Sequence, residues 1–451
     1  MSLPSRLAAV LIILAAAAGA TPPTAEHVLS LADCVREALA ANPELGAALT
    51  RAEAADAAAA ATAAGRLPRL DLTAGYLYSE RAQRLVQPSF QGEVLRYDND
   101  IAEAAVEVRV PLYAGGRLVA RTRAAELTAA ASHLALASTR QDLVLNVIAA
   151  YLAAVEQRAA IEAVQGSLDA LDAQLAVART MEEVGRIPPL DRLKVEVRAA
   201  AVRQRLSRAR RDRELILHHL ATLLGRGPER ATPEVGEAPA PLPVDNDPDA
   251  LVAEALVSRP EIGAARHDAN RAREELAVTA GERWPAIDAY ARYTARSVAP
   301  PEGGALPGHA EYGSGGVSLK LPLWTGGELG ARIAQARARL AEAEHRARAV
   351  ELRITEEVRR EFAGHAEAVE REEVAKRALE QARDAFAIER ANYELGRSAI
   401  NDVLDAQAAL LEAELAHAQA GHDLALAGVA VARAAGRDVA ALLVGRGGDR
   451  R

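Results

Sequence analysis

The stretch VRVPLYAGGRLVAR at residues 108–121 recurs, with substitutions, as LKLPLWTGGELGAR at residues 319–332. In both copies an alternating apolar run leads to Pro-Leu-aromatic, then to Gly-Gly, and then to a helical pattern. The matching positions are Pro111 and Pro322, Tyr113 and Trp324, Gly115 and Gly326, and Gly116 and Gly327. Chance does not readily produce so unusual a phrase twice, so the chain is expected to be internally duplicated.

The similarity extends to both sides of this phrase. ANPELGAAL at residues 41–49 resembles SRPEIGAAR at 258–266. RLPRLDLTAGYLY at residues 66–78 resembles RWPAIDAYARYTA at 283–295, and EEVGR at 182–186 resembles YELGR at 393–397. Beyond the repeated phrase the spacing between matching residues stays constant, so the later elements of both copies have equal lengths. We expect two structural repeats, at residues 21–225 and 249–436. A proline-rich strap at residues 226–248 would connect them, and residues 437–451 would form a short C-terminal tail.

The N-terminus and the composition indicate an exported protein. Residues 1–20 combine Arg6, a short apolar segment and Ala-Gly-Ala, as a secretory signal peptide does. The formal net charge of -8 gives no reason to expect a nucleic-acid partner. Cys34 is the only cysteine, so an intramolecular disulfide is excluded.

Each repeat is expected to contain two half-buried strands. Apolar and polar residues alternate with a period of two in four windows, at residues 67–80, 100–112, 284–297 and 311–323. Ten of the fourteen aromatic residues lie within residues 67–113 and 284–324, which span these windows and the loops between them. Tyr113, Trp284 and Trp324 stand at predicted strand ends, where the aromatic girdle of a membrane barrel would lie. Ordinary strand propensity of aromatic residues explains part of this clustering.

A long helical hairpin is expected after each Gly-Gly pair, over residues 117–225 and 328–436. The first helix of each hairpin lacks proline and would be about 100 Å long, roughly three times the thickness of the bilayer's hydrocarbon core. Charged residues cover it, so it must project into water. Gly185 and Gly396 would turn the chain at the hairpin tips. Beyond the N-terminus no run of eighteen uninterrupted apolar residues exists, and no transmembrane helix is expected.

Four strands cannot close a membrane barrel, since known barrels have at least eight. Open strand edges are not tolerated in lipid, so the barrel must be shared between chains. Three copies would supply twelve strands and a hollow lumen. The expected fold is therefore an α+β membrane protein, with a trimeric twelve-stranded transmembrane β-barrel continued by a periplasmic α-helical barrel.

The mature chain resembles the TolC-type outer-membrane efflux proteins over its whole length. The resemblance rests on the doubled Pro-Leu-aromatic-x-Gly-Gly phrase, the Asn-Pro-Glu and Arg-Pro-Glu helix starts, and NYELGRSAINDVLDAQAALLEAE at residues 392–414. It implies a homotrimeric channel in the bacterial outer membrane with its helical barrel in the periplasm. It also implies three kinds of partner: outer-membrane lipid, a periplasmic adaptor protein and an inner-membrane pump.

The resemblance also implies a periplasmic gate. The two aspartates of NDVLD match Asp402 and Asp405, which in the family ring the narrow entrance. Tyr393 matches a tyrosine that ties the second hairpin to an aspartate of the first, here Asp191 by position. The helix macrodipole alone also favours acids in a first helical turn, and this alternative stays open.

The hairpin tips resemble the surface that meets adaptor hairpins. The residues concerned are Gly185, Arg186, Gly396, Arg397 and Ser398. The chain departs from the family pattern at Ser398, where some members carry a basic residue, and at Pro188-Pro189 in the first tip. Ordinary turn chemistry would explain the same residues.

Other classes of protein fit the sequence less well. It contains no phosphate loop, nucleophile elbow or zinc-ligand spacing, so neither an enzyme nor a cofactor or metal site is expected. A periplasmic adaptor would have one hairpin inside a β-rich domain, and a structural coiled-coil rod would not need the strands. The outlet of a type I protein secretion system remains an alternative to a drug or metal efflux channel.

Overall fold

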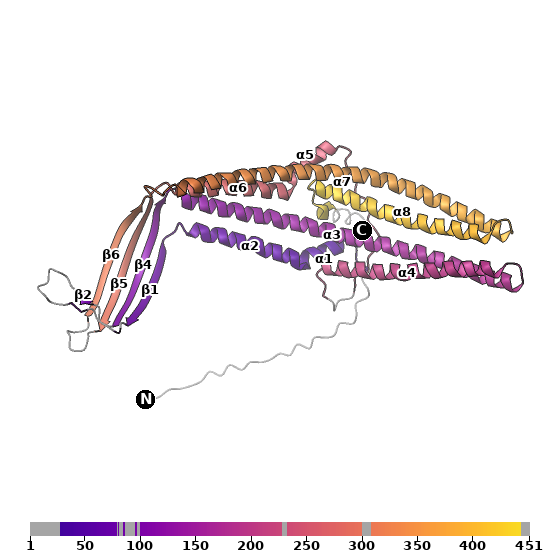
Figure 1. Cartoon of the computed structure of the whole chain (residues 1–451), viewed down its shortest axis with the longest axis horizontal. Coiled ribbons are helices and arrows are strands. Elements are labelled where there is room, and N and C mark those ends of the chain that lie inside the picture. The colour runs from indigo at the N-terminus through magenta and orange to yellow at the C-terminus, as the bar shows by residue number, and fades with distance from the viewer. Residues whose placement is uncertain are drawn as a thin grey trace, which may run out of the picture.

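The computed structural model describes residues 28–78, 80, 84–85, 95–96, 100–227, 232–299 and 308–442. The expected signal peptide, strap residues 228–231 and tail residues 443–451 lie outside this part of the chain. The long helices and the four-stranded antiparallel sheet expected from the sequence are both present. The sheet lies at one end of an elongated helical body (Figure 1).

The sheet has the strand order β1-β4-β5-β6, so the two repeats join between β4 and β5. The strands are β1 Arg69–Tyr78, β4 Asp100–Ala114, β5 Ala286–Ala299 and β6 Gly308–Lys320. A second, two-stranded sheet pairs β2 (Arg84–Leu85) with β3 (Leu95–Arg96).

Two strands differ from the expected alternation at their junction ends. β6 stops at Lys320, whereas the alternation predicts a strand to residue 323. Its pairing with β5 ends at Ala286, and Pro322 has no amide hydrogen to extend the ladder. β4, in contrast, continues through Pro111. Its pairing register with β5 shifts between Pro111 and Tyr113, which leaves one residue unpaired, as in a β-bulge.

Each repeat contributes a broken helix and a helical hairpin. The first repeat has α1 Leu31–Ala41, α2 Pro43–Ala64, α3 Arg117–Glu183 and α4 Pro189–Leu223. The second has α5 Pro248–Ser258, α6 Pro260–Gly281, α7 Glu328–Glu394 and α8 Ile400–Ala434. At 67 residues each, α3 and α7 would be about 100 Å long.

The broken helices end and restart where a polar side chain precedes proline. The Asn42 Oδ1 atom accepts hydrogen bonds from the amides of Glu44 and Leu45, and so caps α2. Its Nδ2 atom donates to the carbonyl of Leu223 at the end of α4. Arg259 has the same place before α6, but its side chain does not cap that helix.

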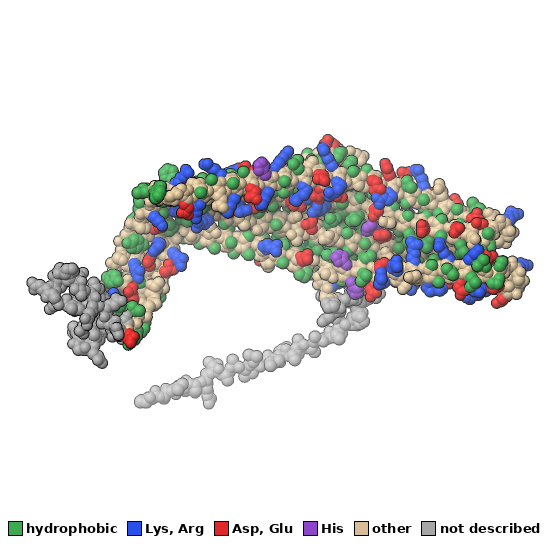
Figure 2. Space-filling view, viewed as in Figure 1, with side chains coloured by type: hydrophobic (Ala, Val, Ile, Leu, Met, Phe, Trp, Pro, Cys, Tyr) green, Lys and Arg blue, Asp and Glu red, His purple; other side chains and the backbone are tan. Residues whose placement is uncertain are grey.

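The long helices lie side by side as a wall (Figure 1). Near the sheet α3 packs against α2 and α6, and further away against α4 and α8. α7 packs against α6 and then α8, so it lies at the side of the wall opposite α4. Acidic and basic side chains are interspersed over this helical body (Figure 2).

Three buried apolar clusters hold the wall together. The largest lies midway along it and includes Val147, Ile148 and Tyr151 of α3. There Leu29 forms an isolated parallel β-bridge with Val235 of the strap. The Tyr151 hydroxyl lies 3.3 Å from the carbonyl of Leu29 and 3.2 Å from that of Glu237, so the strap is fastened to the wall.

Helix α3 also contains an 18-residue window that is long and apolar enough to cross a membrane by length and composition alone. Charged residues interrupt the apolar residues of this window. A search for uninterrupted apolar runs in the sequence therefore does not detect it. Within the chain 39% of that window is buried. Core helices of soluble proteins pass the same test, and α3 packs against five other helices.

Candidate functional site

The register of the four-stranded sheet separates an apolar face from a charged face. Leu72 is paired with Val106 and Val106 with Tyr293, while Ile287 is paired with Leu319. Residues in direct register point to the same face. Leu72 and Leu319 are 71% and 65% exposed in the single chain, so none of the described residues covers this part of the apolar face.

The opposite face carries ion pairs. Arg69 pairs with Asp71 at 2.9 Å, Arg109 with Glu107 at 2.7 Å, and Arg292 with Glu103 at 3.1 Å. The exposed fractions of these side chains range from 25% for Glu107 to 80% for Arg69, which suits a surface in contact with water. The alternation therefore gives the sheet one face suited to lipid and one suited to an aqueous lumen.

Both outer strands of the sheet have an unpaired edge. β1 pairs only with β4, and β6 only with β5, within the described residues. Such edges present free amide and carbonyl groups, which another chain can pair. A membrane-embedded sheet with this apolar face would need its edges closed by further copies.

The junction glycines adopt the left-handed backbone expected where strand changes to helix. The φ angles of Gly115, Gly116, Gly326 and Gly327 are 62°, 77°, 62° and 88°. A Cβ atom at Gly115 would lie 2.4 Å from the carbonyl oxygen of Gly281, whereas a Cβ at Gly326 would meet open space. The two junctions thus need glycine for backbone angle, and the first needs it also for close packing.

The three aromatic residues proposed for the membrane interface lie near the sheet's junction end. Tyr113 belongs to β4, Trp284 precedes β5 by two residues, and Trp324 follows β6 by four. Their exposed fractions are 44%, 60% and 88%. They lie at the height where strands give way to helices, which is the place expected of an interfacial girdle.

The hairpin tips are tight turns with exposed apolar residues. Gly185 and Gly396 have φ angles of 71° and 72°, and Arg186 and Arg397 beside them are exposed. Val184, Leu190 and Leu395 are also exposed at these tips, although the sequence analysis did not select them. Exposed apolar residues next to cations are typical of a protein contact surface.

Asp402 and Asp405 lie one turn apart on an exposed face of α8, and the intervening Val403 and Leu404 are buried. The Asp402 Oδ2 atom accepts from the amide of Ala399 at 3.0 Å and lies 3.4 Å from the Ser398 hydroxyl. Asp402 therefore also stabilises the first turn of α8. Asp405 has no hydrogen bond or ion pair within the described part of the chain.

Ser398 occupies the position where some relatives have a basic residue. Its hydroxyl lies 2.7 Å from Oε2 of Glu389, near the end of α7. The side chain thus links the end of one hairpin helix to the start of the next, and it does so without a positive charge.

Tyr393 and Asp191 come from different hairpins and lie near each other. Burial, together with the charge of Asp191, raises the pKa of the Tyr393 phenol. No hydrogen bond between the two side chains is present among the described residues. The nearest partner of Asp191 is Lys194, whose Nζ atom lies 3.4 Å from its Oδ1.

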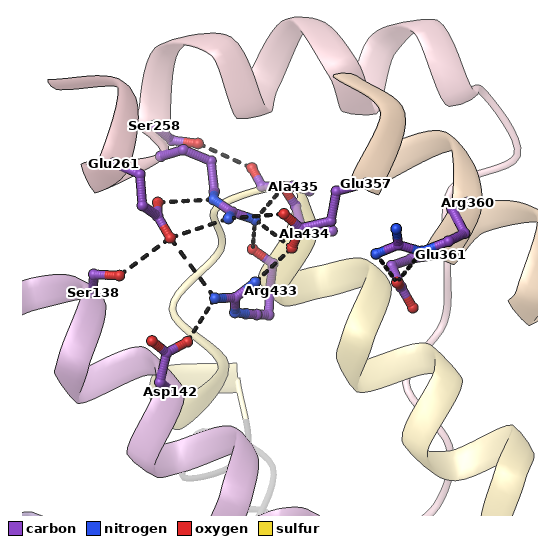
Figure 3. A network of polar contacts seen from close by, with 11 residues as sticks. Ser138, Asp142, Ser258, Glu261, Glu357, Arg360, Glu361, Arg433, Ala434 and Ala435 are labelled. Atoms are coloured by element: carbon purple, nitrogen blue, oxygen red, sulfur yellow. Dashed lines mark hydrogen bonds and ion pairs between the residues drawn. The ribbon is translucent and has the colours of Figure 1, made fainter. Parts of the chain in front are cut away.

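A buried ion network midway along the wall was not found by sequence reasoning (Figure 3). The Arg259 guanidinium binds Glu261 and Glu357, and Arg433 binds Glu357 and Asp142. The side chain of Arg259 is only 3% exposed. The network connects α3, α6, α7 and α8, and its members are far apart in the sequence.

Within the described residues, no group of three or more His, Cys, Asp or Glu side chains could hold a metal ion.

A model of the family described as outer membrane efflux protein matches residues 34–226 and 251–437. The outer membrane efflux protein BepC of Brucella suis biovar 1 (strain 1330) is 26% identical over 337 residues, which cover 74% of this chain and 71% of that protein. Two solved structures share the fold. CmeC of Campylobacter jejuni, an outer membrane channel, has a TM-score of 0.78 at 17% identity and covers 92% of this chain and 88% of its own. The outer membrane protein VceC of Vibrio cholerae has a TM-score of 0.76 at 21% identity and covers 90% and 96%.

Proposed function

The chain belongs to the outer membrane efflux protein family, and we propose that three copies form one conduit from a periplasmic adaptor and inner-membrane pump to the cell exterior. Members of this family are outer-membrane channels rather than enzymes. The trimer, the adaptor and pump as partners, and the gate are proposals.

The observation that carries the trimer is the four-stranded sheet with two unpaired edges and one apolar face. Pairing β1 of one copy with β6 of the next would satisfy both edges. Three copies give twelve strands, which is within the range of membrane barrels, whereas two give only the minimum of about eight. The helical walls of the three copies would then enclose the periplasmic part of the conduit.

The proposed gate consists of Asp402 and Asp405 around the threefold axis. Their exposure on one face of α8 supports this role. A trimer would bring six carboxylates together, and rings of carboxylates select and bind cations. Asp402 also caps its helix, so Asp405, whose side chain has no partner among the described residues, is the cleaner residue to test.

The proposed adaptor contact consists of the two hairpin tips. Gly185, Arg186, Gly396, Arg397 and Ser398 would provide turns and polar contacts, and the exposed Val184, Leu190 and Leu395 would provide apolar contacts. Interfaces of this kind combine a small apolar centre with a polar rim.

Single-channel recording in planar bilayers tests the gate. The wild-type channel is expected to be cation-selective, and millimolar trivalent cations on the periplasmic side are expected to block it. Asp405→Asn should weaken the block, and the double variant that also carries Asp402→Asn should weaken it further. Asp249→Asn, on the exposed start of α5, is the control and should leave the block unchanged.

Undiminished block in the double variant would refute the gate. The trimer has a separate test, because the mass of the detergent-solubilised protein by light scattering should correspond to three chains. A monomer that still inserts into lipid would refute the shared barrel.

A further inference from the structure

A large cavity lies between the helical wall and the strap. Its volume is about 810 Å³, and its lining comes from α3, α7, α8 and strap residues 238–241. All of these segments belong to one chain, so the cavity does not depend on the proposed trimer. Sites for small organic molecules commonly have volumes of about 300–1,000 Å³.

The lining of this cavity is mainly apolar but carries an excess of acids. Leucines and one aromatic ring, that of Phe386, contribute much of the apolar surface. The charged lining residues are four glutamates and one arginine: Glu156, Glu162, Glu372, Glu414 and Arg383. A ligand that suits this surface is apolar and carries positive charge.

Two of these acids, one on α3 and one on α8, are only loosely paired. Glu156 lies 3.7 Å from Nδ1 of His422, and Glu414 lies 3.9 Å from Arg383. Burial raises the pKa of both carboxyl groups, and each cationic neighbour offsets that rise only in part. Within the described part of the chain, the Nδ1 atoms of His417 and His422 are buried without a hydrogen-bond partner. The polar groups of the lining are therefore incompletely satisfied by the chain itself.

The internal repeat shows that the return helix of a hairpin does not require an acid at the position of Glu414. The return helix of the first hairpin, α4, has the same length as α8. At the positions that match Glu414 and His422, α4 carries Arg203 and Arg211. Glu414 is thus particular to α8, the return helix beside the cavity.

We propose that this cavity binds an amphipathic organic cation. The positive charge would lie near Glu414, and the apolar body would pack against Phe386 and the surrounding leucines. A cation over an aromatic ring, next to partly desolvated carboxylates, gains from both contacts.

Tetraphenylphosphonium is a suitable probe, and tetraphenylborate is an anion of nearly the same size and shape. The full chain in amphipol would be titrated with each probe by calorimetry. The cation is expected to bind in a saturable manner with one site per chain, and the anion is not. Equal binding of the two probes would overturn the proposal.

Two variants locate the site. Gly421 lines the cavity, and a Cβ at this position meets nothing within 4 Å. Gly421→Leu should therefore fill the cavity and abolish binding, and leucine is also the better helix former. Glu414→Gln should weaken binding about tenfold through loss of one charged contact. The control is Glu412→Gln, on an exposed position of α8 outside the cavity, which should bind as the wild type does.

Far-ultraviolet circular dichroism would establish that each variant is folded. Wild-type affinity in folded Gly421→Leu, or an equal loss in Glu412→Gln and Glu414→Gln, would place any binding elsewhere and overturn the proposal. Loss of probe binding in Gly421→Leu or Glu414→Gln, with normal channel conductance, would support the proposed cavity site. The cavity site and the gate are made of different residues, so the two properties should change independently.

Discussion

Replacing Arg259 by alanine is expected to destabilise the protein more than any exposed arginine replacement. The Arg259 guanidinium donates to Glu261 and Glu357 over 2.9–3.2 Å and lies 3.3 and 3.4 Å from the carbonyls of Ala434 and Arg433. Its side chain is 3% exposed, and those of the two glutamates are 22% and 19% exposed. The substitution removes the cation and leaves both carboxylates in place.

Breaking a buried ion pair by removing one partner costs about 3–5 kcal/mol. The lower part of this range is expected here, because Arg433 still lies 2.5 Å from Glu357 and 3.7 Å from Glu261. A control is available on α6, the helix that Arg259 precedes. Arg266 also joins α6 to α7, by a 3.0 Å contact with Glu351, but it is 56% exposed. Arg266→Ala should cost at most about 1 kcal/mol.

The effect of pH gives a second, independent signature. Burial tends to raise the pKa of Glu261, but the hydrogen bonds and charge of Arg259, together with a backbone hydrogen bond and the charge of Arg433, outweigh burial and hold the pKa below its usual 4.5. In the wild type this group therefore adds stability above about pH 4.5, and that stability is lost as pH falls through the lower folded pKa. In Arg259→Ala the largest of these offsets is lost, so the pKa should rise. The variant should then be least stable relative to wild type near neutral pH, and the difference should shrink as the carboxyl groups become protonated.

Guanidinium unfolding of the two variants and the wild type, followed by helical circular dichroism at pH 7.5 and pH 5, measures these differences. A deficit in Arg259→Ala no larger than that of Arg266→Ala would show that the buried network does not stabilise the wall. A deficit that grows as the pH falls would refute the assignment of unpaired carboxylates as its cause.

Three further predictions follow from single positions. Gly115→Ala should lower trimer yield more than Gly326→Ala: both have a φ of 62°, which costs alanine about 1–2 kcal/mol, but only Gly115 also meets the carbonyl of Gly281. Tyr393→Phe should leave the conductance in planar bilayers unchanged, because the hydroxyl does not bond Asp191, whereas Tyr393→Ala should raise it by removing a ring that packs against a buried cluster. Cys34 is fully buried, and burial raises its pKa to about 12, so maleimide should label it at pH 8 only after unfolding.

The order of elements could be predicted because its signals are local. Gly115 and Gly326 need positive φ angles, and Asn42-Pro43 and Arg259-Pro260 interrupt a helix wherever they occur. Each signal depends on a few neighbouring residues, and the duplication supplied every signal twice. The end of β6 was placed three residues too late, because alternation alone does not show where the partner strand stops.

The ion network and the acidic cavity could not be predicted in this way. Arg259 meets Glu357 and Arg433 only because α6, α7 and α8 converge midway along the wall. In the sequence, Glu414 is one of many acids on a charged helix, and nothing local distinguishes it from Glu412. Only the packing of α7 and the strap against α8 shows which of them faces a cavity.

The two repeats also show which contacts the architecture needs twice. Arg226 binds Glu37 at 2.7 Å in the first repeat, and the matching Arg437 binds Glu254 at 2.8 Å in the second. In each case a cation just beyond the end of a return helix binds the first segment of the broken helix. This pair is retained in both copies because both hairpins must be fastened at this height.

Asn42 and Arg259 show where the copies have different tasks. Both donate to carbonyls at the end of a return helix, but only the arginine reaches further, to Glu357 of α7. Helix α3 has neighbours on both sides and buries sixteen residues, whereas α7, of equal length, buries only six. Because α7 lies at the side of the wall, it gains less from apolar packing within its own chain. The ion network that holds α7 in place compensates for this smaller gain. The apolar residues that α7 leaves exposed, among them Leu352, Val374 and Ile388, are then available to the neighbouring copy that the proposed trimer would place beside it.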